Sequence, residues 1–326
     1  MTVTRGRTPW SLLGVIGALT ALVIAAHGGA LRGTFHYDDL FAVVNNPAVR
    51  SWDPVRIARS TEAVNSERNA SGYRPLTVGS LALNYRLSGL DASGYLATNL
   101  LLHVLASALV VLLARELLGD LRWAAAAGAV FALHPVNAEA VNYVTARSSL
   151  LSTVFALAAA WAFVRDAEGR AGVGGRAAGL VAFLCALLSK ESAVALAAPV
   201  LVYPWLFRRR PSDAKAFSRG VRAAAGYGVV AAGFVAGFGL LTAGGTTVLV
   251  PGQRPAWTFL EMVGRSMALW VWPWPLGLDH PLTFLSRFDA VLAAVLLIGA
   301  AGFVAAVLWL RARAPAAAWG MIWAAA

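Results

Sequence analysis

The chain has 326 residues, of which 59% are hydrophobic and only 13% charged, and its mean hydropathy is +0.65. A soluble domain carries about 25% charged residues, so this composition excludes a soluble globular fold. The formal net charge of +11 comes from basic residues gathered in short segments between apolar runs, as in multi-pass membrane proteins. We therefore expect an all-α polytopic membrane protein in contact with the lipid bilayer, and no nucleic-acid partner.

Eight apolar segments are candidates for membrane-spanning helices, each of which needs about 17–25 residues to cross. In chain order they are 10–30, 95–118, 123–136, 150–164, 175–188, 193–207, 221–241 and 290–310. Segments 123–136 and 175–188 are short and need flanking polar residues to complete a span. A ninth helix begins at Pro315, because proline suits the first helical position. The sequence stops inside that segment, so we expect the chain to be a fragment of a longer protein, truncated at its C-terminus.

Basic residues alternate between the connections of these segments. One set of connections holds Arg5, Arg7, Arg115, Arg122, Arg165, Arg170, Arg176, Arg208, Arg209, Arg210, Lys215, Arg219, Arg222, Arg311 and Arg313. The other short connections hold only Arg147 or Lys190. The positive-inside rule then places the N-terminus in the cytoplasm and the two long loops, 31–94 and 242–289, outside it. Frequent arginine and alanine are typical of a GC-rich bacterial genome, so we expect a bacterial inner (plasma) membrane.

Most polar residues that interrupt the apolar pattern fall on the predicted outer side. They lie in FHYDDLFAVVNN (35–46), YRPL (73–76), HPVNAEAVNYVTARS (134–148), SKES (189–192) and LDH (278–280). Acids, amides, imidazoles and cations together in otherwise apolar surroundings indicate a functional site. This mixture predicts an active site on the extracytoplasmic face.

Each group also has a structural alternative. The acidic pair Asp38 and Asp39 has the residue type that caps the following helix, and His134 before a proline suits the end of a span. Glu139 and Arg147 are two helical turns apart and suit an ion pair, and Lys190–Glu191 suits a solvated pair at a membrane boundary. Lys190 is one of only two lysines among 27 basic residues, which favours a need for a compact ammonium group at that place.

Taken in order, YDD, YRPLTVGSLALNYRLSGLDASGYLATNLLLHVL, FALHPVNAEAVNYVTARSSLLSTVFAL, LLSKES and WVWPWPLGLDH resemble the membrane region of one family. This is the family of transmembrane and tetratricopeptide-repeat (TMTC) O-mannosyltransferases, and the resemblance covers about residues 35–280. It implies a GT-C glycosyltransferase fold, a helical bundle with a large first extracytoplasmic loop, spread over residues 1–326. Two departures are that the family has more spans and carries tetratricopeptide repeats, which are absent from this sequence.

The resemblance implies transfer of a sugar, mannose favoured, from a polyprenyl-phosphate donor to a hydroxyl of a protein or glycan acceptor. An inverting transfer needs a general base for the acceptor proton and cations for the phosphate that leaves. We expect Asp39 to be the base, with Asp38 as its partner or substitute, because partial desolvation raises a carboxyl pKa towards neutrality. The expected phosphate-binding cations are Lys190, Arg147 and Arg74. The remaining pocket residues are expected to be His134, Asn137, Glu139, Glu191 and His280.

Other functions and cofactors are less favoured. Asp38, Asp39, Glu139 and His134 are metal-ligand types, but their spacing matches no metal motif and the resembled enzymes are regarded as metal-independent, so we expect no metal or other cofactor. The alternative function is a transporter or flippase for a lipid-linked or polar substrate, whose site would lie on broken helices near the bilayer midplane. A membrane scaffold would leave the clustered acids and cations unexplained. The single cysteine, Cys185, suits a small buried core residue.

Overall fold

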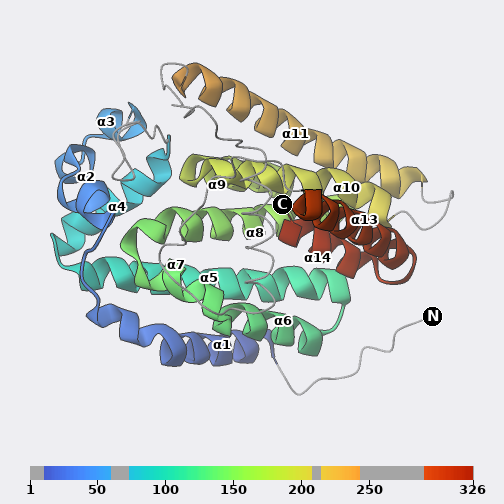
Figure 1. The fold of residues 1–326 in the computed structure, drawn as a ribbon, viewed down its shortest axis with the longest axis horizontal. Helices are drawn as coiled ribbons and strands as arrows, with labels where there is room; N and C mark the ends of the chain where they lie inside the picture. Colours follow the sequence, from blue (N-terminus) through green and yellow to red (C-terminus); the bar gives the residue numbers. More distant parts are fainter. Residues whose placement is uncertain (1–10, 60–72, 208–213, 243–289, 326) are drawn as a thin grey trace.

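The computed structural model describes residues 11–59, 73–207, 214–242 and 290–325, and in these ranges it contains helices and turns but no β-strand (Figure 1). The longer helices are α1 (Leu12–His27), α4 (Pro75–Ser88), α5 (Ala92–Leu118), α6 (Leu121–Leu133), α8 (Arg147–Ala167), α9 (Val173–Ser189), α10 (Ala197–Phe207), α11 (Ala214–Thr242), α13 (Ala290–Arg313) and α14 (Pro315–Ala325). The short elements include α2 (Pro47–Ser51), α3 (Pro54–Arg59), α7 (Ala138–Asn142), the π-helical turn η2 (Leu40–Val44) and the 3-10 helix η5 (Glu191–Leu196).

Several of these helices meet the length and composition of a membrane span. Four described segments are long and apolar enough to cross: Leu12–Arg32, Ala92–Leu118, Val144–Ala167 and Ala214–Gly239. Leu121–Leu133, Val173–Ser189 and Glu191–Phe207 are apolar but shorter. The prediction of an all-α polytopic membrane protein is confirmed.

Every apolar segment singled out in the sequence forms a helix over nearly all of its described residues, including the segment that begins at Pro315. The helices often begin before the apolar run because polar caps add a turn. The Asp91 carboxylate accepts the backbone N–H of Ser93 at 3.0 Å, so α5 starts at Ala92. The Asp120 carboxylate accepts the N–H of Arg122 at 2.7 Å and starts α6 in the same way. Such caps satisfy backbone donors that the first turn of a helix leaves unpaired.

Helices α1, α5, α8 and α9 lie side by side with their axes roughly aligned (Figure 1). Helices α1, α6 and α8 contact α5, whereas α9 and α11 contact α8. Two glycines allow close approach: a Cβ at Gly128 would clash with Val111 on α5, and one at Gly179 would lie 2.9 Å from the Cβ of Ala162 on α8. Small residues at such crossings let helices approach closely in a membrane.

Short connections between antiparallel helices bring particular ends together. The ends of α1, α6 and α9 and the starts of α5 and α8 gather at the end of the bundle that carries α2, α3 and α4 (Figure 1). We call this the α4 end. All the polar blocks predicted to lie outside the cytoplasm are at this end, except those outside the described residues.

The first long loop is more structured than its sequence suggested. Pro75 occupies the first turn of α4, and this helix runs for 14 residues through the predicted loop. The hydroxyl of Thr77 donates to the carbonyl of Ser189 at 2.8 Å and ties α4 to the end of α9. Residues 60–72 of this loop and residues 243–289 of the second long loop lie outside the described residues, so the predicted pocket residue His280 does too.

Candidate functional site

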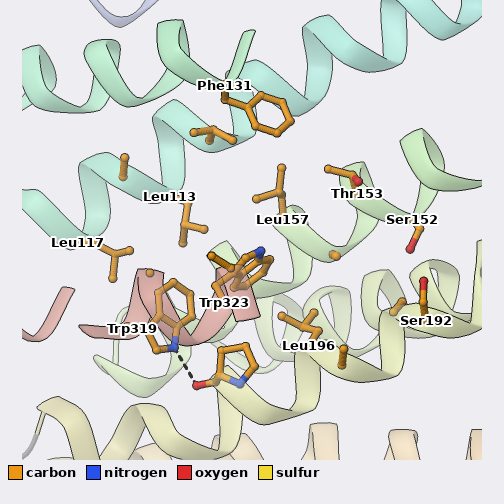
Figure 2. Close-up of a pocket in the computed structure, with 18 residues that line it drawn as sticks. Leu113, Leu117, Phe131, Ser152, Thr153, Leu157, Ser192, Leu196, Trp319 and Trp323 are labelled. Atoms are coloured by element: carbon orange, nitrogen blue, oxygen red, sulfur yellow. Dashed lines mark hydrogen bonds between the residues drawn. The ribbon is translucent and has the colours of Figure 1, made fainter. Parts of the chain in front are cut away.

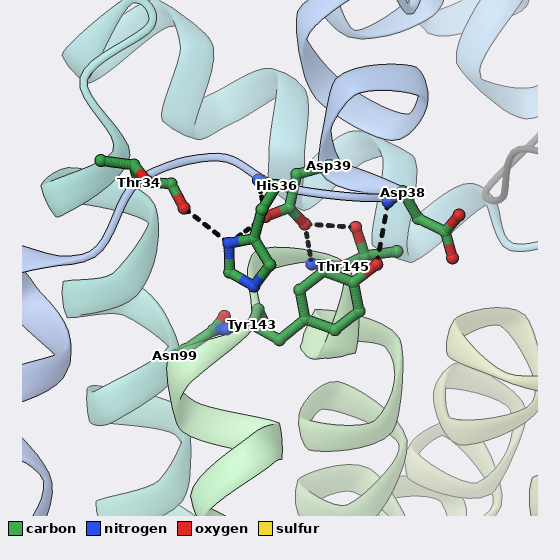
Figure 3. Close-up of polar contacts among 7 residues, drawn as sticks. All are labelled: Thr34, His36, Asp38, Asp39, Asn99, Tyr143 and Thr145. Atoms are coloured by element: carbon green, nitrogen blue, oxygen red, sulfur yellow. Dashed lines mark hydrogen bonds and ion pairs between the residues drawn. The ribbon is translucent and has the colours of Figure 1, made fainter. Parts of the chain in front are cut away.

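The acidic pair follows η1 (Gly28–Arg32) and lies in the turn that leads into η2, against the connection between α7 and α8. Asp39 is completely buried, with 0% of its surface exposed. One carboxylate oxygen accepts the backbone N–H of Thr145 at 2.8 Å and the Thr145 hydroxyl at 2.5 Å (Figure 3). The other accepts the N–H of His36 at 3.3 Å. The carboxylate of Asp39 is therefore committed to holding two chain segments together.

Asp38 has a different setting although it is the adjacent residue. It is half-buried, and its backbone N–H donates to the hydroxyl of Tyr143 at 3.0 Å. Its carboxylate points away from the contacts between Asp39 and Thr145 (Figure 3). The two carboxylates thus differ in direction and in access to solvent, which favours Asp38 as the group that can meet a substrate.

The structure does not match the helix-cap alternative for Asp39. The side chain of Asp39 precedes η2 but makes no capping hydrogen bond to it, because its oxygens are taken by Thr145 and His36. The ring of His36 stacks on that of Tyr143 at a centroid distance of 5.1 Å. Burial raises the pKa of Tyr143 to about 12, so its phenol stays protonated at neutral pH and supports the backbone of Asp38.

Arg147 lies deep in the bundle, with 0% of its surface exposed. Its guanidinium donates to four neutral oxygens: Asn99 Oδ1 at 2.5 Å, and Ser80 Oγ, Asn84 Oδ1 and the carbonyl of Tyr95 at 2.8 Å each. These partners belong to α4 and α5, so Arg147 joins them to α8. The predicted phosphate contact is not favoured for a cation so enclosed, and the predicted alternative pairing with Glu139 is not found.

Two other predicted cations, Arg74 and Lys190, approach one another at the α4 end. Arg74 holds Glu191 through two parallel hydrogen bonds, 2.8 Å from Nε to Oε2 and 2.6 Å from Nη2 to Oε1. The ammonium of Lys190 donates to the hydroxyl of Ser149 at 2.8 Å. Burial lowers the pKa of Lys190, and the nearby charge of Arg74 lowers it further, against the opposing effect of Glu191 and Glu139. The group is a compact cluster of two cations and two carboxylates.

Of the remaining predicted pocket residues, His134 and Asn137 form hydrogen bonds with nearby backbone groups. Nδ1 of His134 accepts the backbone N–H of Val136 at 3.2 Å, and the side-chain amide of Asn137 donates to the carbonyl of Phe131 at 2.7 Å. Both hydrogen bonds lie at the connection between the end of α6 and the start of α7. Glu139 is exposed, in the first turn of α7. Within the described part of the chain, no group of three or more histidine, cysteine or carboxylate side chains is arranged to hold a metal ion.

The structure adds residues that the sequence did not single out: Tyr143, Thr145, Ser149 and Asn99. The first two lie inside the block HPVNAEAVNYVTARS, whose mixture of polar residue types was the available signal. Their partners are 105 and 106 residues away in the chain. A hydroxyl on its own does not indicate such a distant contact.

A cavity of about 430 Å³ lies between α5, α8, η5, α10 and α14 (Figure 2). Most of its lining is apolar, and Trp319 and Trp323 of α14 form one side, with Trp319 Nε1 donating to the carbonyl of Pro199 at 2.7 Å. The polar lining residues include Ser152 and Ser192. Ser152 lies one helical turn beyond the Ser149 that binds Lys190, and Ser192 lies two residues beyond Lys190 itself. This part of the cavity is therefore next to the cluster of cations and carboxylates.

Comparison with known proteins identifies similar sequences over about half of the chain. It is 34% identical to protein O-mannosyl-transferase F38B6.6 of Caenorhabditis elegans over 46% of this chain and 23% of that protein. It is 36% identical to protein O-mannosyl-transferase Tmtc1 of Drosophila melanogaster over 56% of this chain and 22% of that protein. For TMTC3 of Homo sapiens the identity is 31%, over 46% of this chain and 17% of that protein.

Over about half of its length, the chain is similar to TMTC proteins. The chain spans about a fifth of the length of F38B6.6, Tmtc1 and TMTC3. No family model and no solved structure matches it. The GT-C arrangement therefore stays a prediction that rests on the sequence motifs.

Proposed function

We propose that the TMTC-like chain is part of a membrane glycosyltransferase that moves a sugar, mannose favoured, from a polyprenyl-phosphate donor to an acceptor hydroxyl on the extracytoplasmic face. The relatives are named as protein O-mannosyl-transferases, which supports a transferase rather than a transporter and a protein as the acceptor. The observation that carries the proposal is the gathering of an accessible carboxylate and a cation cluster at the same end of the bundle, with an apolar cavity beside the cations.

In this proposal the base is Asp38, and Asp39 is a positioning residue, which exchanges the order expected from the sequence. Asp38 takes the proton of the acceptor hydroxyl while the oxygen attacks the anomeric carbon of the sugar. The bond from that carbon to the phosphate oxygen breaks, its electron pair stays on the phosphate, and the anomeric configuration inverts. A base in hydrogen-bond reach of the attacking hydroxyl contributes about 10²–10⁴-fold to such a step.

Lys190 and Arg74 would meet the lipid phosphate, whose negative charge grows as the bond breaks. Preorganised cations in surroundings that exclude water stabilise such charge well. The cavity of about 430 Å³ is within the size of ordinary small-molecule sites, about 300–1,000 Å³. Its apolar lining suits a stretch of isoprenoid chain, and its serines lie on the side of Lys190.

The test is transfer from a labelled polyprenyl-phosphate sugar to serine- and threonine-containing peptides in membranes that contain the full-length protein. We expect Asp38→Asn to lower the rate of transfer about 10²-fold or more, with the protein level and the melting temperature unchanged. Asp39→Asn should lower both the rate and the melting temperature, because Thr145 loses a charged acceptor in a buried place.

Glu168→Gln is the matched control, because Glu168 lies between α8 and α9, away from the α4 end. It should leave transfer unchanged. Full transfer by Asp38→Asn with loss in Asp39→Asn would restore Asp39 as the base, and full transfer by both variants would remove the pair from the reaction.

A further inference from the structure

The pair formed by Arg74 and Glu191 occupies the place where the proposed function needs an unpaired cation. Both carboxylate oxygens of Glu191 accept hydrogen bonds from the Arg74 guanidinium, Oε2 from Nε at 2.8 Å and Oε1 from Nη2 at 2.6 Å. A phosphate would bind the same two N–H groups, because phosphate and carboxylate oxygens match the guanidinium fork in the same way. Phosphate and Glu191 are therefore competitors for Arg74.

The pair is neither buried nor fully solvated, since 20% of the Arg74 side chain and 34% of the Glu191 side chain are exposed. A buried pair would be very costly to open, whereas an exposed pair contributes little. This intermediate setting allows an arriving anion to displace the carboxylate without first unfolding the site. Glu191 is the first residue of η5.

Lys190 is the cation that an arriving phosphate would contact before it displaces Glu191 from Arg74. It precedes Glu191 in the chain, and its ammonium is held by the hydroxyl of Ser149 at 2.8 Å, a neutral partner. A phosphate next to Lys190 would gain one cation without displacing any acid and would then meet Arg74. Ser192, which follows Glu191 in the chain, lines the apolar cavity. A lipid whose tail lies in the cavity would therefore place its phosphate next to the pair of Arg74 and Glu191.

We propose that Glu191 is an internal stand-in for the donor phosphate: it holds Arg74 while the site is empty and releases it when a lipid phosphate binds. This inference rests on the proposed function, because it assumes that a lipid phosphate is the ligand of Arg74 and Lys190. It assigns to Glu191 a regulatory role in donor binding, instead of the general pocket role expected from the sequence. The carboxylate keeps the cation in position, and it lowers the affinity for anions that have no lipid tail to retain them.

The test measures binding of geranylgeranyl phosphate to the full-length protein in nanodiscs by native mass spectrometry. Glu191→Gln keeps the size of the side chain but removes the competing charge, and we expect it to tighten binding about tenfold, as the loss of a bidentate charged competitor implies. Geranylgeraniol, which has the tail without the phosphate, should bind both proteins equally. Inorganic phosphate should bind detectably only to Glu191→Gln.

Two further variants separate this effect from a general change in the protein. Glu116→Gln removes an acid that pairs with Arg165 and Arg170 at the opposite end of the bundle, and it should leave the affinity unchanged. In the double variant Arg74→Gln/Glu191→Gln the tenfold gain should disappear, because the gain depends on the freed guanidinium.

The outcomes distinguish the two proposals. If the wild-type protein binds geranylgeranyl phosphate and Glu191→Gln binds it no more tightly, the role of Glu191 is wrong and the proposed function stands. An equal gain for geranylgeraniol would also overturn the role of Glu191, since it would mean that the cavity had widened. If neither protein binds the lipid phosphate, both proposals fail.

Discussion

Neighbouring residues of the same type have opposite surroundings in this protein. Asp39 is completely buried and holds Thr145, whereas the half-buried Asp38 directs its carboxylate elsewhere (Figure 3). A buried carboxylate with several donors is held firmly and is less suited to accept a substrate proton than one that a substrate can reach. The division of roles within the pair thus follows from access rather than from residue type.

The same contrast separates the cations. Arg147 is enclosed by four neutral acceptors, while the ammonium of Lys190 donates to the Ser149 hydroxyl and lies near Arg74. Removing a buried polar partner leaves each acceptor unsatisfied, at a cost of about 1–3 kcal/mol apiece. Arg147 therefore stabilises the junction of α4, α5 and α8, and Lys190 is the cation that is placed to bind an anion.

The lowered pKa of Lys190 predicts how donor binding depends on pH. Because burial lowers this pKa, Lys190 loses its proton at a lower pH than an ordinary lysine, and the affinity for a lipid phosphate should fall correspondingly early on the alkaline side. Lys190→Arg keeps its charge over this range, so its affinity should hold to higher pH. The measurement is the KM for the polyprenyl-phosphate donor as a function of pH.

The stability of the fold should not follow this decline. The unfolded chain holds the Lys190 proton more tightly than the folded chain, so the free energy of unfolding rises with pH through this range. A melting temperature measured beside each KM is the control. The same alkaline decline in wild type and Lys190→Arg would show that another group titrates.

At the scale of elements, close crossings of helices build the bundle on which the site rests. Gly179 of α9 faces α8 and α11: a Cβ there would lie 2.5 Å from the hydroxyl of Tyr227 and 2.9 Å from the Cβ of Ala162. The Tyr227 hydroxyl already donates to the carbonyl of Ala159 at 2.8 Å. The end of α9 leads to Lys190, so the crossing helps to determine where the cation lies.

We predict that Gly179→Ala destabilises the protein by about 1–3 kcal/mol, the ordinary cost of overpacking a filled interior. The methyl group must push α9 from α8 or break the hydrogen bond of Tyr227. Gly17→Ala is the matched control, since a Cβ at Gly17 in α1 meets nothing within 4 Å and alanine favours a helix by about 1 kcal/mol over glycine. Thermal unfolding in detergent measures both, and a Gly179→Ala protein as stable as Gly17→Ala would contradict this account of the crossing.

At the scale of the whole molecule, the two ends of the bundle carry different chemistry. The α4 end combines acids, amides, hydroxyls and cations, whereas the opposite end is dominated by arginine–carboxylate pairs, in which Glu116 meets Arg165 and Arg170, and Asp166 meets Arg176. The sequence placed these arginines on the cytoplasmic side. The two sets of connections between helices lie at opposite ends of the bundle, in agreement with the predicted alternation of basic residues. Which end faces the cytoplasm stays a prediction.

Labelling of introduced cysteines tests that prediction in a Cys185→Ser background. Tyr37, at the α4 end, is 69% exposed, and the side chain of Arg122, at the other end, is 71% exposed. We expect a membrane-impermeant maleimide to label Tyr37→Cys in intact spheroplasts and Arg122→Cys only after the membrane is permeabilised. The reverse pattern would place the α4 end in the cytoplasm and would contradict an extracytoplasmic site.

The sequence alone was sufficient for the membrane class, the helical segments and the grouping of the described polar blocks at one end of the bundle. These properties depend on the length of apolar runs, on charge in short connections and on local caps, all of which are written in consecutive residues. The boundaries were less accurate because caps such as Asp91 and Asp120 lengthen helices beyond their apolar part. The short helices of the first loop were not predicted, since their apolar pattern is weak.

Only the tertiary structure decided which of the polar residues are buried and which partners they have. Asp39 meets Thr145 across 106 residues, and Arg74 meets Glu191 across 117. These contacts determine burial, pairing and pKa, and none has a signal in the local sequence, because the partners come together only when α4, α8 and α9 pack. The residue types therefore indicated where polar groups gather, while the packing separated the half-buried Asp38 from the completely buried Asp39 and Arg147.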